Sequence, residues 1–332
     1  MSGGCLVRLP SWLGDTVMSI PILRALERAF PGRLTLWGKK RFAGLLASVG
    51  LKTSYIPYGR RRGLPGLWDA TTIVAVLRRR RPDLALLLPN AFEPALLSTL
   101  AGIPKRVGYA TDGRAWLLTD AVTRIPFHHR IHDADRFAGL LPSLDIEAPR
   151  ADDGLLEPSP QMRERARHLL PAAGDFLGLV PGAANGPSKR WPATAYAALA
   201  SAAAERWHAR PVLLGSTNDL PVTEEVRAAC KAECLDLVGT DLVDLAAALM
   251  RCRVVVSNDS GAAHLAAALR CPTVVVFGPT DPQRTCPHGP QVRVAQAGCF
   301  CQPCHAHRCP LDHRCMTRLA SETVLQMVDS LW

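Results

Sequence analysis

Three loops of this sequence carry residue types that could do chemistry, and each follows a short apolar run. The loop at residues 10–15 reads PSWLGD, the one at 181–192 reads PGAANGPSKRWP, and the one at 257–264 reads SNDSGAAH. Carboxylates, cations and glycines at helix starts are suited to binding an anion and to moving a proton. The loops together predict a site for a diphosphate-linked donor.

Asp15 stands where a helix is predicted to begin, directly after Gly14, which lets the backbone turn tightly. A carboxylate at this place can take a proton from a substrate hydroxyl. It can also simply cap the helix, which is worth about 1 kcal/mol. The spacing alone leaves both roles open.

The second loop holds Lys189 and Arg190 between a predicted strand and a predicted helix. With two glycines and a hydroxyl beside them, these cations can hold an anion through charge and backbone N–H groups. A purely structural loop has little use for two cations at this point.

The third loop opens a helix near Asp259, and the first N–H groups of a helix have no partner within it. The amides of residues 260–262 could therefore hold a phosphate, with His264 one turn further on. An ordinary capped helix with a hydrogen-bonded histidine is the alternative. We expect Lys189 and these amides to hold the diphosphate while Asp15 approaches from the opposite domain.

Residues 299–315 contain five cysteines and three histidines in 17 residues. The spacings C-x2-C and C-x5-C resemble those of zinc or cluster sites. Disulfides and free thiols in a packed loop are alternatives, and a reducing compartment disfavours disulfides. We interpret the segment as a structural or regulatory appendage, and the spacing does not say which four cysteines would bind a metal. The candidate ligands are Cys299, Cys301, Cys304, Cys309 and Cys315.

Apolar strands that alternate with amphipathic helices must position these loops. Strands are expected at 5–9, 34–37, 54–57, 84–88, 176–180, 212–214, 235–238, 254–257 and 273–277. Continuous apolar strands between helices predict parallel sheets that are covered on both faces. The fold class is therefore α/β, with two doubly wound, Rossmann-like domains. Asn90 is expected to cap a helix that runs to Gly102, and a helix at 321–331 closes the chain.

The chain has 332 residues, which corresponds to two domains of about 150 residues each. Periodicity fades at 145–160, so we place the linker there and divide the domains into 1–155 and 156–332. Ligands of such sheets bind at the carboxyl ends of strands. The cleft between two facing domains is therefore the expected site.

The composition is that of an ordinary globular protein, with 20% charged residues and a net charge of +10. This excludes a disordered, collagen-like or coiled-coil protein. No apolar run approaches the roughly 20 residues that span a bilayer, and the first residues do not read as a secretory signal. We therefore expect a cytoplasmic protein. The motifs of dinucleotide dehydrogenases and P-loop NTPases are absent from the sequence.

Basic residues cluster at 39–41, 60–62, 78–81 and 105–106, all in the first half. A positive face attracts nucleic acid, acidic lipid or a phosphorylated substrate. Solvated helix ends are the alternative, since residues 78–81 would close a helix just before Pro82.

The sequence resembles the ADP-heptose:lipopolysaccharide heptosyltransferases, most of all their heptosyltransferase II branch. The resemblance covers nearly the whole chain. It rests on PSWLGDTVMS (10–19), LLLPNAFEPALL (86–97), AGIPKRVGY (101–109), PGAANGPSKRWP (181–192), LLGSTND (213–219), SNDSGAAHLAAAL (257–269) and VVVFGPTDP (274–282).

The resemblance implies a GT-B glycosyltransferase with an acceptor-binding first domain and a donor-binding second domain. It implies inverting transfer of L-glycero-D-manno-heptose from ADP-heptose to the heptosyl-Kdo-lipid A inner core. No catalytic cofactor or metal is implied. We expect the protein to act at the inner face of the cytoplasmic membrane, and we expect that it has no nucleic acid partner.

The resemblance also assigns residues. Asp15 is the expected general base and Lys189 the group that stabilises the leaving diphosphate. The expected donor-binding residues are Ser188, Lys189, Asp259, Ser260, Gly261 and His264. The family also has an acid that binds the donor ribose; it does not map onto one matching residue here, and Asp219, at the end of the stretch 212–219, is the candidate. The expected acceptor-binding residues are Trp12, Asn90, Lys105 and Arg106.

Three alternatives stay open or weak at this point. Heptosyltransferase I or III, or transfer of another sugar on the same scaffold, is separated poorly by sequence. A nucleic-acid-binding regulator with a zinc-like tail would fit the charge, but the low aromatic content of 6% speaks against it. A glycoside hydrolase would need two facing carboxylates, and only Asp15 is well placed.

Overall fold

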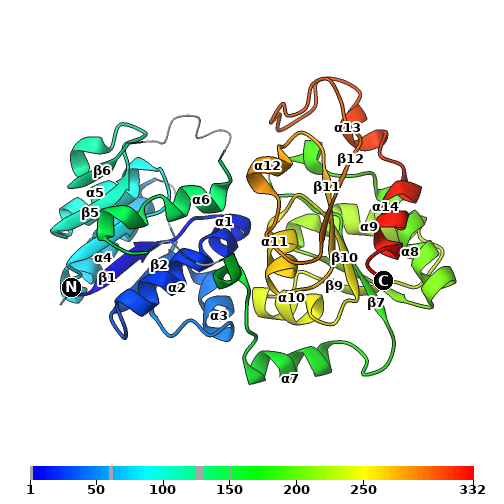
Figure 1. The fold of residues 1–332 in the computed structure, drawn as a ribbon, viewed down its shortest axis with the longest axis horizontal. Coiled ribbons are helices and arrows are strands. Elements are labelled where there is room, and N and C mark those ends of the chain that lie inside the picture. The colour runs from blue at the N-terminus through cyan, green and yellow to red at the C-terminus, as the bar shows by residue number, and fades with distance from the viewer. Residues whose placement is uncertain (1–2, 60–62, 124–130, 148, 150, 185) are drawn as a thin grey trace. The chain divides into compact units, whose positions relative to one another are not determined.

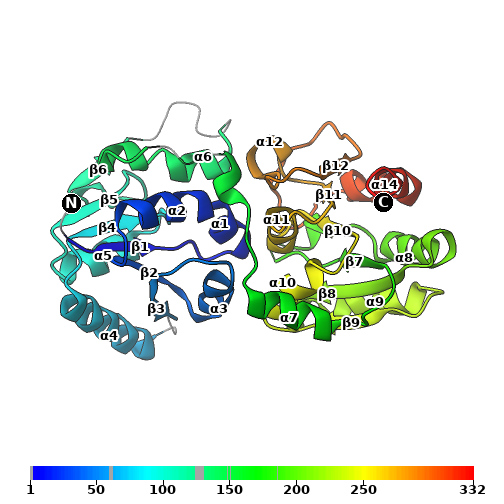
Figure 2. The same cartoon turned by 60° about the horizontal axis from the view of Figure 1, so that its bottom comes forward.

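The structure is a computed structural model that describes residues 3–59, 63–123, 131–147, 149, 151–184 and 186–332. The basic cluster at 60–62 lies outside these residues. The chain forms two compact units, Met1–Gly154 and Leu155–Trp332. Each unit holds a six-stranded parallel sheet with helices on both faces, as Figures 1 and 2 show. The predicted α/β fold with two doubly wound sheets is confirmed.

The strands of the first sheet lie in the order β3-β2-β1-β4-β5-β6, and every neighbouring pair is parallel. The two central strands, β1 and β4, are buried at every residue, as expected for strands covered on both faces. The strands are β1 (Cys5–Arg8), β2 (Leu34–Lys39), β3 (Ser54–Tyr58), β4 (Leu84–Leu87), β5 (Lys105–Tyr109) and β6 (Asp120–Val122).

The second sheet repeats this arrangement in the order β12-β11-β10-β7-β8-β9, again all parallel. The strand order therefore reverses between β1 and β4 in one sheet and between β7 and β10 in the other. The strands are β7 (Phe176–Val180), β8 (Arg210–Gly215), β9 (Leu235–Val238), β10 (Val254–Asn258), β11 (Thr273–Phe277) and β12 (Val292–Gln296).

In the first unit, α4 and α5 cover one face of the sheet. Their apolar residues, such as Leu77 and Ala95, pack with Leu6 and Leu87 in one core cluster. Figure 1 shows α6 beside α1 and α2. The helices are α1 (Leu13–Met18), α2 (Ile20–Ala29), α3 (Lys40–Ser48), α4 (Leu64–Arg80), α5 (Phe92–Leu100) and α6 (Asp133–Ala138).

In the second unit, α8, α9 and α14 pack on one face of the sheet through residues such as Tyr196, Val226 and Val324. Figure 1 shows α7, α10 and α11 on the other side of these strands. The helices are α7 (Pro160–Leu169), α8 (Ala193–Trp207), α9 (Leu220–Ala229), α10 (Leu242–Leu249), α11 (Gly261–Ala268), α12 (Pro282–Thr285), α13 (Arg314–Thr317) and α14 (Ser321–Asp329).

Several details differ from the sequence-based expectation. Strands β5, β6 and β12 were not predicted, and α7 begins inside the expected linker. The cap of α5 is Ala91, so the prediction that Asn90 caps this helix was wrong. The arginines at 78–81 do close α4, with Arg81 in the left-handed conformation at its end, which confirms their interpretation as a helix terminus.

Candidate functional site

Most of the predicted site residues lie in the loops and helix starts that directly follow the two central strands of a sheet. Asp15 follows β1 and Asn90 follows β4, while Lys189 follows β7 and Asp259 follows β10. The strand order reverses between the members of each pair, so their connections diverge to opposite faces and leave a crevice. Each unit therefore presents its candidate residues at its topological switch point.

In the first unit, Trp12, Asp15 and Asn90 line one cavity of about 290 Å³. The Oδ1 atom of Asn90 is buried, and among the described residues it accepts no hydrogen bond. A buried acceptor without a partner is costly, so this atom is suited to accept a hydrogen bond from a bound hydroxyl.

Asp15 lies in the first turn of α1, where the N-cap residue is Trp12. The backbone at Asp15 is part of the helix, since its carbonyl accepts from the Ser19 N–H at 3.0 Å. Asp15 is therefore not the N-cap that the structural alternative required. Its half-buried position on a cavity wall is compatible with a proton-accepting role.

Two residues that the sequence did not single out, Asp133 and Arg136, line the same cavity. They form an ion pair on α6, with Arg136 Nη1 at 2.6 Å from Asp133 Oδ1. The Tyr109 hydroxyl donates to the Arg136 carbonyl at 2.6 Å and fixes the helix. The motif DADRFA carries no periodic or spacing signal, so only the fold could place this cation beside Asp15.

Trp12 is half exposed, and the ammonium of Lys39 lies 5.6 Å from the centre of its ring. Burial, together with repulsion from Arg41 and Arg8, lowers the pKa of Lys39. Lys39 therefore places one cation beside the loop that carries Asp15.

Lys105 and Arg106 are not brought to the cavity. They begin β5, at the edge of the sheet opposite to the loop after β4. Lys105 Nζ donates to the Ser143 carbonyl at 3.2 Å, and Arg106 Nε donates to the Leu117 carbonyl at 2.7 Å. Both side chains thus bind backbone carbonyls of their own unit, and their predicted contact with an acceptor stays a prediction.

In the second unit, Lys189 and Asp259 form a buried ion pair. Lys189 Nζ lies 2.6 Å from Asp259 Oδ2, and the side chains are 14% and 5% exposed. The Thr280 hydroxyl, in the loop after β11, donates to the same oxygen at 2.7 Å. Loops after β7, β10 and β11 therefore meet at one carboxylate.

Lys189 keeps a donor for a ligand. Among the described residues its ammonium has two acceptors, the carboxylate of Asp259 and, at 3.3 Å, the Asp259 carbonyl. One of its three N–H groups is therefore left for a ligand. Beside it, Ser260 is the N-cap of α11 and Gly261 its first residue. The third N–H of Lys189 and the first backbone N–H groups of α11 are hydrogen-bond donors suited to a phosphate group.

Asn258 ties the two central loops of this unit together. Its Oδ1 accepts from the Trp191 backbone N–H at 3.0 Å, and its Nδ2 donates to the Pro181 carbonyl at 2.8 Å. Asn258 is fully buried, so this bridge fixes the loop that carries Lys189 relative to the start of α11. The sequence-based reasoning missed this role, because an Asn at a strand end is also a common turn residue.

Asp219 lies near the same edge, in the 3₁₀ turn Thr217–Asp219 after β8. Its Oδ2 accepts from the Ser216 backbone N–H at 2.9 Å and from the Ser216 hydroxyl at 2.7 Å. The loop after β7 approaches closely, since a side chain at Gly182 would meet the Asp219 carboxylate. Asp219 thus has a structural role here, and its predicted contact with the donor ribose stays a prediction.

Ser188 and His264 are both buried. The Ser188 hydroxyl donates to the Ala306 carbonyl, and the Ser188 carbonyl lies 2.6 Å from His313 Nε2. Ser188 thus anchors the cysteine-rich segment, whereas His264 lies one turn into α11 as expected. Their direct contact with a donor is a prediction.

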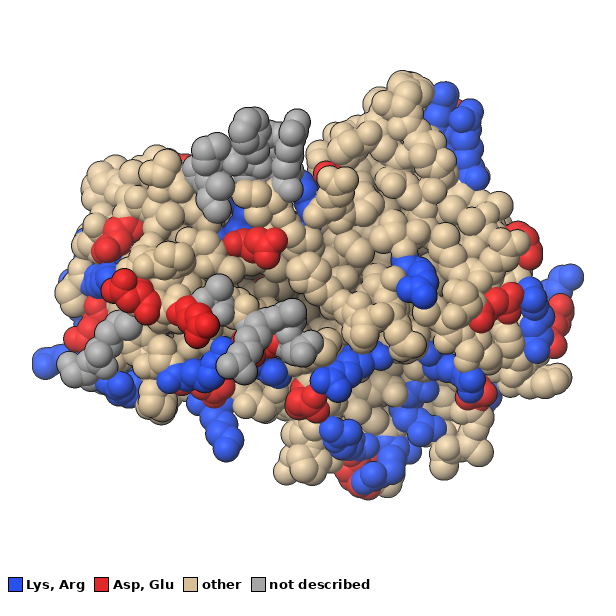
Figure 3. All heavy atoms as spheres, in the orientation of Figure 1, with Lys and Arg blue, Asp and Glu red and all other residues tan. Residues whose placement is uncertain are grey.

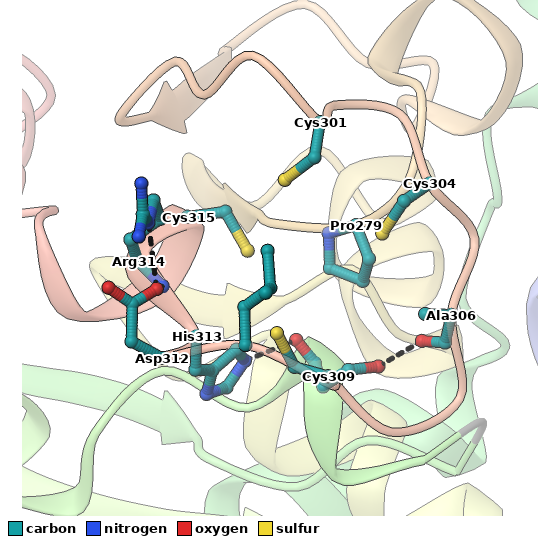
Figure 4. A pocket seen from close by; sticks show the side chains of 11 residues that line it. Pro279, Cys301, Cys304, Ala306, Cys309, Asp312, His313, Arg314 and Cys315 are labelled. Carbon is teal, nitrogen blue, oxygen red and sulfur yellow. Dashed lines mark hydrogen bonds and ion pairs between the residues drawn. The ribbon is translucent and has the colours of Figure 1, made fainter.

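The five cysteines of the segment 299–315 are free thiols. Four of them, all except Cys299, line a cavity of about 20 Å³ that also touches Ser188. Figure 4 shows their sulfur atoms around this space. Among the described residues, no group of three or more His, Cys, Asp or Glu side chains is arranged to hold a metal ion.

Two surface properties complete the description. Figure 3 shows basic side chains along the lower margin of the view with acidic side chains among them. Over the part of the chain that the structure describes, no helix combines the length and the apolar character needed to cross a membrane.

Comparison with known proteins identifies the family. Residues 71–314 match the profile of glycosyltransferase family 9 (heptosyltransferase). The chain belongs to this family. It is 32% identical over 306 residues to Lipopolysaccharide heptosyltransferase 2 of Escherichia coli, covering 86% of this chain and 85% of that protein. It is also 32% identical over 300 residues to Lipooligosaccharide heptosyltransferase 2 of Haemophilus influenzae, with 84% of each chain covered.

Solved structures of this family have the same fold. E. coli ADP-heptose lps heptosyltransferase II matches with a TM-score of 0.82 and 27% identity, over 99% of this chain and 98% of that one. E. coli heptosyltransferase WaaC with ADP matches with a TM-score of 0.78 over 99% of both chains, and at 19% identity this shows the fold alone. The protein is therefore a glycosyltransferase with the GT-B architecture.

Proposed function

We propose that this glycosyltransferase moves L-glycero-D-manno-heptose from ADP-heptose to the heptosyl-Kdo-lipid A inner core of lipopolysaccharide, with inversion. The observation that carries the proposal is the cluster of Lys189, Asp259 and Thr280 at the switch point of the second sheet. It offers a cation and helix amides to a diphosphate, in a chain that is similar to enzymes named heptosyltransferase 2.

The two units divide the work in this proposal. The second unit binds ADP-heptose through Lys189 and the first turn of α11, and the first unit binds the acceptor. The acceptor hydroxyl attacks the anomeric carbon of the heptose opposite the departing diphosphate. Asp15 takes the proton of that hydroxyl as the bond forms. Lys189 stabilises the charge that ADP gains, so the transfer step uses no cofactor.

The cavity at Asp15 supports an anionic acceptor. Arg136 lines it as a partner of Asp133, and Lys39 lies over Trp12, another lining residue. Cations near the base favour an acceptor with phosphate or carboxylate groups, as in a lipid A-linked sugar.

We also propose that the protein works at the inner face of the cytoplasmic membrane. Leu67 and Trp68 on α4 are strongly exposed, and the same helix ends with three arginines. Aromatic and basic side chains together favour an anionic lipid surface. Co-sedimentation with anionic vesicles tests this, and Trp68→Ser should reduce the bound fraction while leaving thermal stability unchanged.

Release of ADP from ADP-heptose tests the main proposal. It is measured with heptosyl-Kdo2-lipid A, with Kdo2-lipid A, and without acceptor. Release with the first acceptor alone supports the proposed position in the core. Release with Kdo2-lipid A alone would instead make the protein a heptosyltransferase I, and binding of ADP-heptose without release would refute both acceptors.

A structural zinc ion in the cysteine-rich segment also belongs to this proposal. It takes no part in the transfer step.

A further inference from the structure

The segment 299–315 directs four thiols at one small space. The cavity of about 20 Å³ is lined by Cys301, Cys304, Cys309 and Cys315. Figure 4 shows these four sulfur atoms around it. A space of this size holds about one water-sized particle and no organic ligand. Cys299 is not among the residues that line it, although it packs against the same core cluster that contains Cys315.

The donor set has the chemistry of a soft cation site. Thiolates are the preferred ligands of Zn²⁺ and of other soft divalent cations, and four of them complete a tetrahedral shell. His313 also lines the cavity, but its Nε2 lies 2.6 Å from the Ser188 carbonyl. This contact occupies one ring nitrogen of His313. The four thiols complete a tetrahedral shell by themselves, so they are taken as the ligand set.

Among the described residues no group of three or more His, Cys, Asp or Glu side chains is placed to hold a metal ion, so the four thiols would have to converge when an ion binds. Cys304 is exposed, so its side chain has room to move. Ligand sets of this kind often converge only when the ion binds. The ion would thus fix the segment around the cavity.

The same segment holds the loops of the donor site from two sides. The Ala306 carbonyl and the His313 ring contact Ser188, the neighbour of Lys189. The side chain of Gln302 donates to the Gly278 carbonyl at 2.6 Å, and the His305 N–H donates to the Pro279 carbonyl at 2.8 Å. The next residue after Pro279 is Thr280, whose hydroxyl donates to the Asp259 carboxylate.

We infer that Cys301, Cys304, Cys309 and Cys315 bind one soft divalent cation, with Zn²⁺ as the reference ion, and that this ion braces the loop that carries Lys189. On binding, S–H bonds break, Zn–S bonds form, and the thiol protons pass to solvent without any redox step. The effect on the donor rests on the proposed function of Lys189.

The first test measures binding of Zn²⁺ alone to the full chain after treatment with reductant and chelator, in competition with a chromophoric chelator. The expected result is one ion per chain, and Co²⁺ in place of Zn²⁺ should give the intense sulfur-to-metal absorption of a tetrahedral thiolate site. Cys304→Ser and Cys309→Ser should each weaken binding by about 100-fold or more. Cys299→Ser is the matched control and should bind as the unchanged protein does.

Absence of a one-to-one complex, or loss of binding in Cys299→Ser with retention in Cys304→Ser, would overturn the ligand assignment. The Co²⁺ spectrum is recorded on the unchanged chain, so it decides the question even where a variant fails to fold.

The second test compares the dissociation constant of ADP with and without the ion. Removal of Zn²⁺ should weaken ADP binding by about 10-fold, and re-addition should restore it in the unchanged protein but not in Cys304→Ser. Equal affinity for ADP with and without Zn²⁺ would refute the proposal that the ion stabilises the loop that carries Lys189. If Zn²⁺ binds as expected but ADP-heptose is neither bound nor turned over, the proposed function fails instead.

Discussion

Replacement of Lys189 by methionine separates its structural from its functional role. Methionine keeps much of the volume of the side chain but removes the ammonium. Asp259 is 5% exposed, so its carboxylate would remain buried, with the Thr280 hydroxyl still donating to it at 2.7 Å. Removal of one member of a buried ion pair costs about 3–5 kcal/mol. Because Thr280 still donates, we expect the lower end, about 3 kcal/mol.

A loss of about 3 kcal/mol in a domain of this size lowers the melting temperature by about 6–12 °C. The double variant Lys189→Met with Asp259→Asn removes the unpaired charge and should regain more than half of the lost stability. Scanning calorimetry of both single variants and the double variant measures this coupling.

Binding of ADP should respond differently. Lys189→Met removes a charge-assisted hydrogen bond to the diphosphate, worth about 1.5–3 kcal/mol, which corresponds to about 10- to 150-fold in affinity. The double variant should stay as weak, because it does not restore the cation. Isothermal titration with ADP at fixed salt measures both. Lys189→Met with unchanged ADP affinity would refute the role of Lys189 at the donor, and absence of coupling would refute the buried ion pair.

Three further changes test other parts of the structure. Asp15→Asn should reduce transfer by about 10²- to 10⁴-fold and leave ADP affinity within about twofold, whereas Asp15→Asn with near-normal turnover would remove Asp15 as the base. Gly186→Ala should weaken ADP binding and lower the melting temperature, because Gly186 has φ +101° and a Cβ would lie 2.4 Å from the His307 carbonyl oxygen. The control is Gly174→Ala, since Gly174 has a similar φ of +106° but open space around its Cβ position, so this variant tests backbone strain alone. The Arg165 guanidinium lowers the pKa of Asp244 and joins α7 to α10, so this pair stabilises the fold above the unfolded pKa of about 3.9 and is lost as the pH falls through the lower folded value. Arg165→Ala should therefore unfold at slightly lower urea at pH 7 and match the unchanged protein near pH 2.

The sequence was most informative where strands are buried on both faces. The runs at β4, β7, β10 and β11 are continuously apolar, so their type and place could be predicted. By contrast, β5 begins with Lys105 and Arg106, which lie at the amino-terminal end of the strand, so its sequence is not a continuous apolar run. The edge strands β6 and β12 are short or alternating, and only pairing with their neighbours makes them strands.

Helix α7 was missed for a related reason. It begins with Ser159 as a capping residue and Pro160 in its first turn, both of which also read as linker residues. Only Met162 and Ala166 of this helix are buried, one turn apart, and the residues between and beside them are mostly charged. Such a helix is stabilised by its contact with α10, which sequence periodicity alone does not predict.

The candidate site shows the same division between local and topological information. Asp15, Lys189 and Asp259 were found because their loops combine glycine, charge and a helix start. Arg136 was missed, and Lys105 was included, because a charge in the sequence does not show at which edge of the sheet it will lie.

Strand order supplies the missing criterion. With β1 beside β4 and β7 beside β10, the crevice of each sheet opens where these central strands end. Asn90 lies at this edge because it follows β4. Lys105 begins β5, four residues before that strand ends at Tyr109, which is roughly 13 Å along the strand. Basic residues that act on a substrate must therefore follow a strand or, like Arg136, stand on a helix that packs beside α1. Arg136 is therefore a better candidate than Arg106 for contact with an anionic acceptor. Arg136→Lys should then weaken acceptor binding, measured as a higher KM with kcat nearly unchanged, while Arg106→Lys should leave KM unaltered. The opposite order would show that the switch point does not define the acceptor site.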